Sequence, residues 1–154
     1  MKKLLFATLS ALSLNAYAIS LPVTESMVNS QVAKTFPKTI KKIELTNPQI
    51  TLLKGKSILC MDGIPRIMFL ENQFKVCASF TPNWNQKEAR LEATNMEVME
   101  INIKDVGSVP SALKGIISEV LFAIEPLVLY KSDSWFLKQV SAIEVEKGIL
   151  YLKY

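Results

Sequence analysis

Histidine is absent from this chain of 154 residues, and only five glycines are present. Without histidine, the Ser-His-Asp and Cys-His forms of nucleophilic catalysis are excluded, and the commonest zinc ligand is missing. The glycines are not grouped as GxGxxG or GxxxxGK, so no phosphate-binding loop is expected. Asp62, Asp105 and Asp133 are too far apart in sequence for a calcium-binding loop. We therefore expect a protein that is not an enzyme and that binds no metal or cofactor.

Net charge is also low, at +4, and it falls to +2 without Lys2 and Lys3. A charge this small does not indicate nucleic-acid binding, which needs a concentrated basic surface. Four lysines are nevertheless close in sequence, namely Lys34, Lys38, Lys41 and Lys42. The cluster predicts a solvated surface. The alternative is attraction to anionic lipid head groups, at about 1 kcal/mol for each basic residue.

Cysteine occurs twice, at Cys60 and Cys77, in strand-like segments on either side of a turn. In an oxidising compartment, an even number of cysteines favours a disulfide, which would stabilise the fold by roughly 3 kcal/mol. The alternative is a pair of buried thiols that act as small apolar side chains. Neither cysteine belongs to a C-x-x-C motif, so a redox catalyst is not expected.

Residues 1–18 have the pattern of a cleavable export signal. Two lysines precede a mostly apolar stretch at residues 4–14, and Ala16 and Ala18 are the small residues that a signal peptidase recognises. The apolar stretch is too short to span a bilayer comfortably. We expect cleavage after Ala18, which leaves residues 19–154 as one exported domain.

Periodicity predicts a first helix and then a series of strands. Thr24 is a good N-cap for this helix, and Pro37 ends it. Alternating apolar residues across 41–104 predict an antiparallel meander. The apolar phase shifts between Val98 and Met99, and such a slip predicts bulges that bend the sheet.

A second helix begins at Ser108 or at Pro110 and is apolar on nearly all sides. A helix of this kind is expected to be enclosed on nearly all sides, because apolar surface is driven out of water. Pro126, two glutamates and the short length of the segment argue against a transmembrane helix.

The chain after the second helix predicts a short helical turn that contains Trp135 and Phe136. Residues 142–146 and 149–154 then predict a hairpin around Gly148. Together these elements predict an α+β fold. We expect a curved antiparallel β-sheet wrapped around a long apolar helix, with a second helix at the N-terminus.

Three short segments stand out, namely Thr24-Glu25-Ser26-Met27-Val28-Asn29, Met96-Glu97-Val98, and Ile143-Glu144-Val145 before the Gly148 turn. They resemble segments of the YceB-like family of proteobacterial envelope proteins, which are described as lipoproteins of unknown function. Their order and separation are similar to those of the family over most of residues 21–154. The resemblance implies half of a BPI-like, or tubular lipid-binding, domain, in which a curved sheet around a helix leaves an apolar groove.

Members of that family carry a lipidated cysteine directly after the signal, whereas residues 15–19 contain none. This departure implies a free periplasmic protein. We expect it to be a non-enzymatic binding protein that holds a lipid or another apolar ligand between sheet and helix. The candidate ligand contacts are apolar helix residues and adaptable methionines. They are Met27, Met96, Met99, Leu113, Ile116, Ile117, Val120, Leu121 and Ile124.

An apolar helical stripe is more often plain core than a ligand site, and that alternative stays open for each of these residues. The other candidate function is a packed envelope protein that binds a protein partner and no small molecule. Its contact surface would include exposed strand edges and four aromatic residues. These are Trp84, Trp135, Tyr151 and Tyr154.

Overall fold

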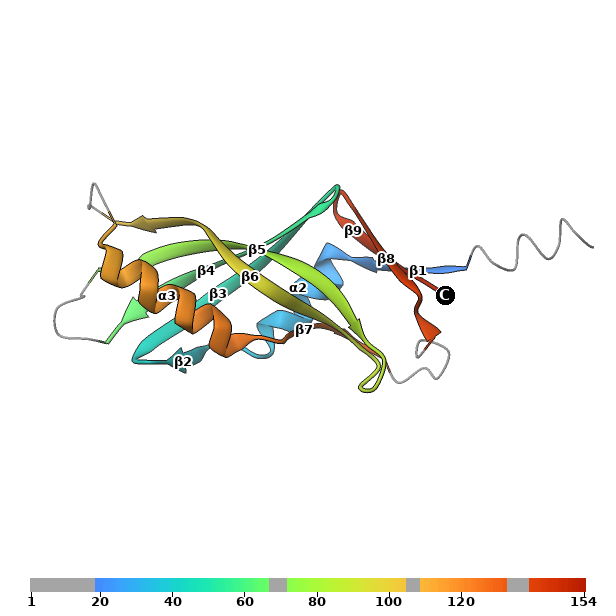
Figure 1. Cartoon of the computed structure of the whole chain (residues 1–154), viewed down its shortest axis with the longest axis horizontal. Helices are drawn as coiled ribbons and strands as arrows, with labels where there is room; N and C mark the ends of the chain where they lie inside the picture. Colours follow the sequence, from blue (N-terminus) through green and yellow to red (C-terminus); the bar gives the residue numbers. More distant parts are fainter. Residues whose placement is uncertain (1–18, 67–71, 105–108, 133–138) are drawn as a thin grey trace, which may run out of the picture.

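A computed structural model of the chain describes residues 19–66, 72–104, 109–132 and 139–154 (Figure 1). The predicted export signal and the predicted helical turn at Trp135 and Phe136 lie outside these residues. Among the described residues, no helix is both long enough and apolar enough to cross a membrane.

Two antiparallel sheets and two helices make up the described part of the chain. The larger sheet has six strands, in the order β2 (Lys38–Ile40), β3 (Ile43–Leu53), β4 (Lys56–Pro65), β5 (Phe74–Asn85), β6 (Arg90–Ile103) and β7 (Leu127–Lys131). The smaller sheet has three, in the order β1 (Ser20–Thr24), β9 (Ile149–Lys153) and β8 (Ala142–Glu146). Helix α2 (Glu25–Ala33) follows β1, and helix α3 (Ser111–Ile124) lies between β6 and β7 in sequence.

The six-stranded sheet is curled, and both helices pack against it. Helix α3 lies at one end of the molecule and the three-stranded sheet at the other, with α2 between them (Figure 1). One continuous hydrophobic core includes side chains from both sheets and both helices.

The expected architecture, a sheet wrapped around a long apolar helix, is wrong. The protein is mostly β, α2 has only nine residues, and α3 ends at Ile124, two residues before Pro126. The outer side of α3 lies in water, where Phe122 is 79% exposed. The apolar residues that predicted one enclosed helix are divided between the inner side of α3 and strand β7. The BPI-like half domain is therefore not the fold of this chain.

Bulges in the long strands account for the curl of the six-stranded sheet. At one of them Met99 has no partner, because Cys77 of β5 pairs with Glu100 and Ala78 pairs with Val98. The extra residue in a bulge increases the local twist and bends the strand. The prediction of a bulged antiparallel meander is thus confirmed, and so is the predicted C-terminal hairpin, which forms β8 and β9.

Helix α2 completes an open edge of β3. Strand β2 pairs with β3 only as far as Leu45, so no strand of the described residues covers the rest of β3 on that side. The Asn29 side chain takes the place of a strand: its Oδ1 accepts the Ile50 N–H at 2.6 Å, and its Nδ2 donates to the Ile50 carbonyl at 3.0 Å. Glu25 accepts the Leu52 N–H at 3.0 Å. These bonds satisfy backbone groups that the packed helix shields from water.

The tips of two hairpins join the two sheets, and they meet at the top of Figure 1. Gly55, in the β3–β4 turn, donates its N–H to the Val145 carbonyl at 3.2 Å. Gly148, in the β8–β9 turn, donates its N–H to the Leu52 carbonyl at 2.9 Å. Both glycines have a positive φ, of 67° and 74°, which side chains disfavour. The two sheets therefore share hydrogen bonds as well as the hydrophobic core.

An exposed ion pair joins Lys153 of β9 to Glu144 of β8. The hydrogen bond from Lys153, together with its positive charge, lowers the pKa of the Glu144 carboxyl. The stability that such a carboxyl contributes is present above its unfolded-state pKa and is lost as the pH falls through the folded-state value. Because water and salt screen an exposed pair, we expect its effect on the free energy of unfolding to be small.

The close approach of Gly63 in β4 to Phe74 in β5 leads to a prediction about stability. A Cβ atom at Gly63 would lie 2.2 Å from Phe74 Cζ, so the ring would have to move within a packed core. We expect Gly63→Ala to lower the free energy of unfolding by about 1–3 kcal/mol, the usual cost of overpacking. The quantity is measured by chemical denaturation.

Gly115→Ala is the matched control for this substitution. A Cβ atom at Gly115, on the outer side of α3, meets no atom within 4 Å. Because alanine favours a helix over glycine, we expect a gain of up to about 1 kcal/mol. Equal free energies of unfolding for the Gly63→Ala and Gly115→Ala variants would show that a methyl group at residue 63 does not strain the packing of Phe74.

Candidate functional site

Helix α3 brings together six of the residues that the sequence predicted as ligand contacts. Ile116 is half-buried and the other five are fully buried. The five are Leu113, Ile117, Val120, Leu121 and Ile124. They recur at helical spacing and pack into the core together with residues of the six-stranded sheet. These side chains are thus part of the core, and their role as ligand contacts stays a prediction.

The three methionines of the predicted site lie on two different elements. Met27 is 39% exposed on α2, and Met96 is half-buried on β6. Met99 is 44% exposed at the β6 bulge. Of these three residues, Met99 is the one that lines the groove beside α3 that is described next.

A groove of about 440 Å³ lies between β6 and α3. Residues 98–101 of β6 line one side, Lys114 and Ser118 of α3 line the other, and Val109 completes the lining. Successive side chains of a regular strand point to opposite faces of the sheet. The bulge at Met99 interrupts that alternation within the four consecutive residues that line the groove. We call this feature the β6–α3 groove.

An open strand edge runs along the β6–α3 groove. Strand β6 pairs with β7 only at residues 90–93, and beyond them no described strand covers that edge. The Glu125 carboxylate, directly after α3, accepts the N–H of Met96. The groove lies beside residues 98–101, just after Met96, which is where the Glu125 side chain no longer covers the open edge of β6.

Local hydrogen bonds occupy two of the polar side chains in the groove. Ser118 Oγ donates to the Lys114 carbonyl at 3.0 Å, and the Glu100 carboxylate accepts from the Asn102 amide at 3.0 Å. The Lys114 side chain is exposed and adds a positive charge. The apolar part of the lining consists of Val98, Met99, Ile101 and Val109. The arrangement can accept an apolar chain whose polar or anionic end lies near Lys114.

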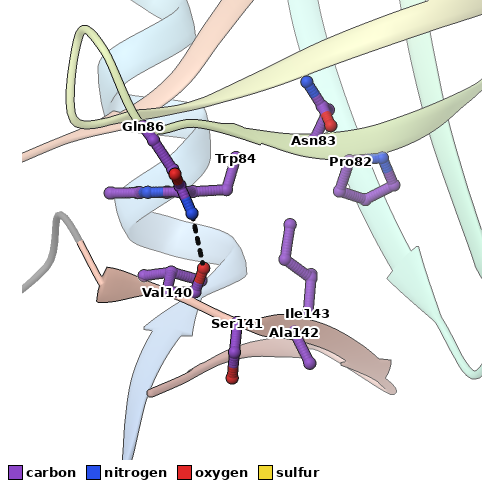
Figure 2. Close-up of a pocket in the computed structure, with 8 residues that line it drawn as sticks. All are labelled: Pro82, Asn83, Trp84, Gln86, Val140, Ser141, Ala142 and Ile143. Atoms are coloured by element: carbon purple, nitrogen blue, oxygen red, sulfur yellow. Dashed lines mark hydrogen bonds between the residues drawn. The ribbon is translucent and has the colours of Figure 1, made fainter.

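A second cavity, of about 430 Å³, lies between the end of β5 and the start of β8 (Figure 2). Gln86 Nε2 donates to the Val140 carbonyl at 3.5 Å across it. The Trp84 ring lies behind the Gln86 side chain, and its buried Nε1–H has no hydrogen-bond partner among the described residues. The exposed lining is mostly polar, so an apolar chain fits this cavity less well than the β6–α3 groove.

The cysteines lie away from both cavities. Cys60 of β4 and Cys77 of β5 are direct partners across the sheet, and a disulfide joins them. They alternate with buried residues along both strands, so the disulfide lies on the face of the sheet opposite the core. In the described part of the chain, no group of three or more histidine, cysteine, aspartate or glutamate side chains is placed to hold a metal ion.

Sequence reasoning singled out one residue of the β6–α3 groove and missed the others. The phase shift at Met99 is the signal that pointed to irregular packing in residues 98–101. No local signal placed Lys114 and Ser118 opposite that strand, because their position depends on how α3 packs back against β6.

Comparison with models of known protein families gives no match for this chain, and comparison with curated proteins gives none either. The resemblance to the YceB-like family therefore stays a prediction. The groove and the sequence patterns are the basis for the function proposed below.

Proposed function

We propose that the protein is an exported, non-enzymatic binding protein that holds a lipid acyl chain or another apolar ligand in the β6–α3 groove. The observation that carries this proposal is the Met99 bulge beside α3, which forms an apolar-lined groove open to solvent. Its volume of about 440 Å³ falls within the range of about 300–1,000 Å³ usual for small-molecule sites. The exposed thioether of Met99 can adapt to an irregular apolar ligand.

The size of the groove indicates modest affinity. Each buried methylene contributes about 0.8 kcal/mol, so a segment of about six methylenes contributes roughly 5 kcal/mol before the costs of binding. Binding of this kind requires no catalytic group in the protein. We therefore expect reversible binding of part of a chain rather than complete enclosure of a lipid.

Two features support export to the periplasm. The first is the signal pattern of residues 1–18. The second is the Cys60–Cys77 disulfide, which is compatible with an oxidising compartment. A disulfide of this kind is also found in exported proteins of unrelated function, so it supports the compartment and not the ligand.

The proposal predicts that a charge in the groove prevents ligand binding. We expect Met99→Glu to weaken binding of a fluorescent fatty acid by at least about tenfold, because the carboxylate would lose water beside an apolar chain. Fluorescence titration of the purified protein measures this change. Met27→Glu is the control, because Met27 is similarly exposed but lies on α2.

Two results would count against lipid binding. One is equal fatty-acid affinity in the Met99→Glu and Met27→Glu variants. The other is native mass spectrometry of gently purified protein that repeatedly shows no bound amphiphile, combined with no fatty-acid binding in solution.

A second candidate function is an envelope interaction protein without a small ligand. It is favoured by the burial of the α3 residues in the core and by the exposure of Phe122. Trp84 is half-buried against the core and is not an exposed contact residue, so Trp84→Ala would test packing as well as binding. Phe122→Ser is the better variant for a pull-down experiment, and loss of a reproducible protein partner would favour this function.

A further inference from the structure

The outer side of α3 presents one large apolar side chain to water. Ser111, Gly115, Ser118 and Phe122 recur every three or four residues and are all exposed, so they form one ridge of the helix. Phe122 is 79% exposed and is the only large side chain on that ridge. Nothing lies within 4 Å of a Cβ atom built at Gly115, so no described element covers the ridge there.

Basic residues flank this ridge on both sides. Lys41, in the β2–β3 turn, forms an ion pair with Glu119 of α3, one helical turn before Phe122. Lys42 is exposed beside it in the same turn. Lys114 is exposed on the opposite flank, where it borders the β6–α3 groove. Of the four lysines that are close in sequence, Lys41 and Lys42 therefore lie beside α3.

The backbone holds the β2–β3 turn in this position. The Arg66 N–H donates to the Lys42 carbonyl at 2.7 Å, and the Arg66 guanidinium pairs with Glu44 at 2.7 Å. The carboxylates Glu44 and Glu119 are thus both already paired with cations. Lys42 and Lys114 have no ion-pair partner among the described residues, so they can contact an anionic ligand.

We propose that Phe122, Lys42 and Lys114 form a docking face for an anionic lipid bilayer. A single exposed aromatic ring between lysines fits the interface of a membrane, where the ring enters among the head groups and the lysines contact phosphates. A stable protein interface needs a packed cluster of large side chains, whereas the ridge beside Phe122 has only serine and glycine. Charge complementarity therefore favours lipid phosphates as the partner.

The docking face shares Lys114 with the rim of the β6–α3 groove. Docking would bring the groove next to the head groups, so an acyl chain could pass between bilayer and protein without crossing bulk water. The docking itself does not depend on the groove holding a ligand.

Co-sedimentation with vesicles tests this proposal. The processed chain is mixed with vesicles of phosphatidylcholine, with or without phosphatidylglycerol. We expect binding that requires the anionic lipid and weakens as the salt concentration rises, since exposed charges are screened. Phe122→Ser should lower the partition coefficient at least about tenfold. Lys42→Glu with Lys114→Glu should lower it at least about 25-fold, from about fivefold for each lysine.

Matched controls separate docking from general effects of charge and hydrophobicity. Lys54→Glu with Lys56→Glu changes the net charge equally at the β3–β4 turn, far from α3 (Figure 1), and Met27→Ser removes an exposed apolar side chain from α2. Both should bind vesicles as the wild type does. Absence of wild-type binding, equal losses in the control variants, or a Phe122-dependent dimer on light scattering would overturn the proposal.

The fatty-acid and vesicle experiments test the groove and the docking face separately, so one proposal can be contradicted without the other. Met99→Asn, which adds a polar but uncharged side chain to the groove beside Lys114, should weaken fatty-acid binding in solution and keep vesicle binding, because Met99 lies outside the docking face. Phe122→Ser should lose vesicle binding and keep fatty-acid binding in solution. Loss of both activities in either variant, with an unchanged melting temperature, would contradict the separation of docking face and groove.

Discussion

Replacing Cys60 and Cys77 together by alanine is expected to lower the free energy of unfolding by about 3 kcal/mol. The disulfide closes a short loop between β4 and β5, with a sequence separation of 17 residues. Closing the loop removes conformations from the unfolded chain, which raises its free energy relative to the folded chain. The two residues are already partners in the ladder, so the folded strands need not move when the bond is lost.

Reduction of the wild-type protein is the matched experiment, because it breaks the same bond without changing the sequence. Denaturant titrations should show that the reduced protein and the double variant lose a similar free energy of unfolding relative to the oxidised wild type. Adding reductant to the double variant should change nothing. A loss below about 1 kcal/mol in both would show that the unfolded chain is already restricted in this loop.

Arg90→Met is expected to have a comparable effect, also about 3 kcal/mol, because it would leave a buried carboxylate without its cation. Glu92 in β6 is only 4% exposed. Its carboxylate accepts from Arg90 Nε at 2.6 Å and from Asn85 Nδ2 at 3.0 Å. Removing Arg90 leaves Asn85 to stabilise the charge alone, and chemical denaturation measures the loss.

Arg66→Met provides the control, because Arg66 forms a similar pair with Glu44 at 2.7 Å but is exposed. An exposed pair contributes at most about 1 kcal/mol. Combining Arg90→Met with Glu92→Leu should recover much of the stability, since no buried charge then remains. If Arg66→Met and Arg90→Met cost the same, burial of Glu92 does not govern the effect.

Local features of the fold could be predicted from the sequence because neighbouring residues determine them. Thr24 accepts the N–H of Met27 at 3.3 Å and begins α2 as expected of an N-cap. Gly148 allows the turn between β8 and β9. The phase shift at Met99 corresponds to a bulge in the ladder. In each case the signal and the structure lie within a few residues of each other.

The environment of α3 could not be predicted in the same way. An apolar side chain indicates a preference for burial, but neighbouring elements determine whether anything covers it. Leu121 is covered by the core, whereas the adjacent Phe122 is left in water. Leu127 and Leu129, which follow Pro126, are buried as alternating residues of β7, in agreement with the expectation that the helix ends at this proline and the chain then runs extended.

The same reason limited the prediction of the site. Met99 could be found because its phase shift is local, although it was expected to face a helix inside the sheet. Lys114 and Ser118 lie opposite Met99 only because α3 packs beside the part of β6 that follows residues 90–93, where β6 no longer pairs with β7. That arrangement is a property of the tertiary structure, and no spacing in the sequence encodes it.

The order β1-β9-β8 places the middle strand of the smaller sheet near the end of the chain. Thr24 pairs with Ile149, and Ser20 pairs with Lys153. Segment 20–24 is therefore synthesised early but has no partner until segment 149–153 has left the ribosome. Because β8 also pairs only with β9 among the described strands, no part of the smaller sheet can form before residues 149–153 have been synthesised.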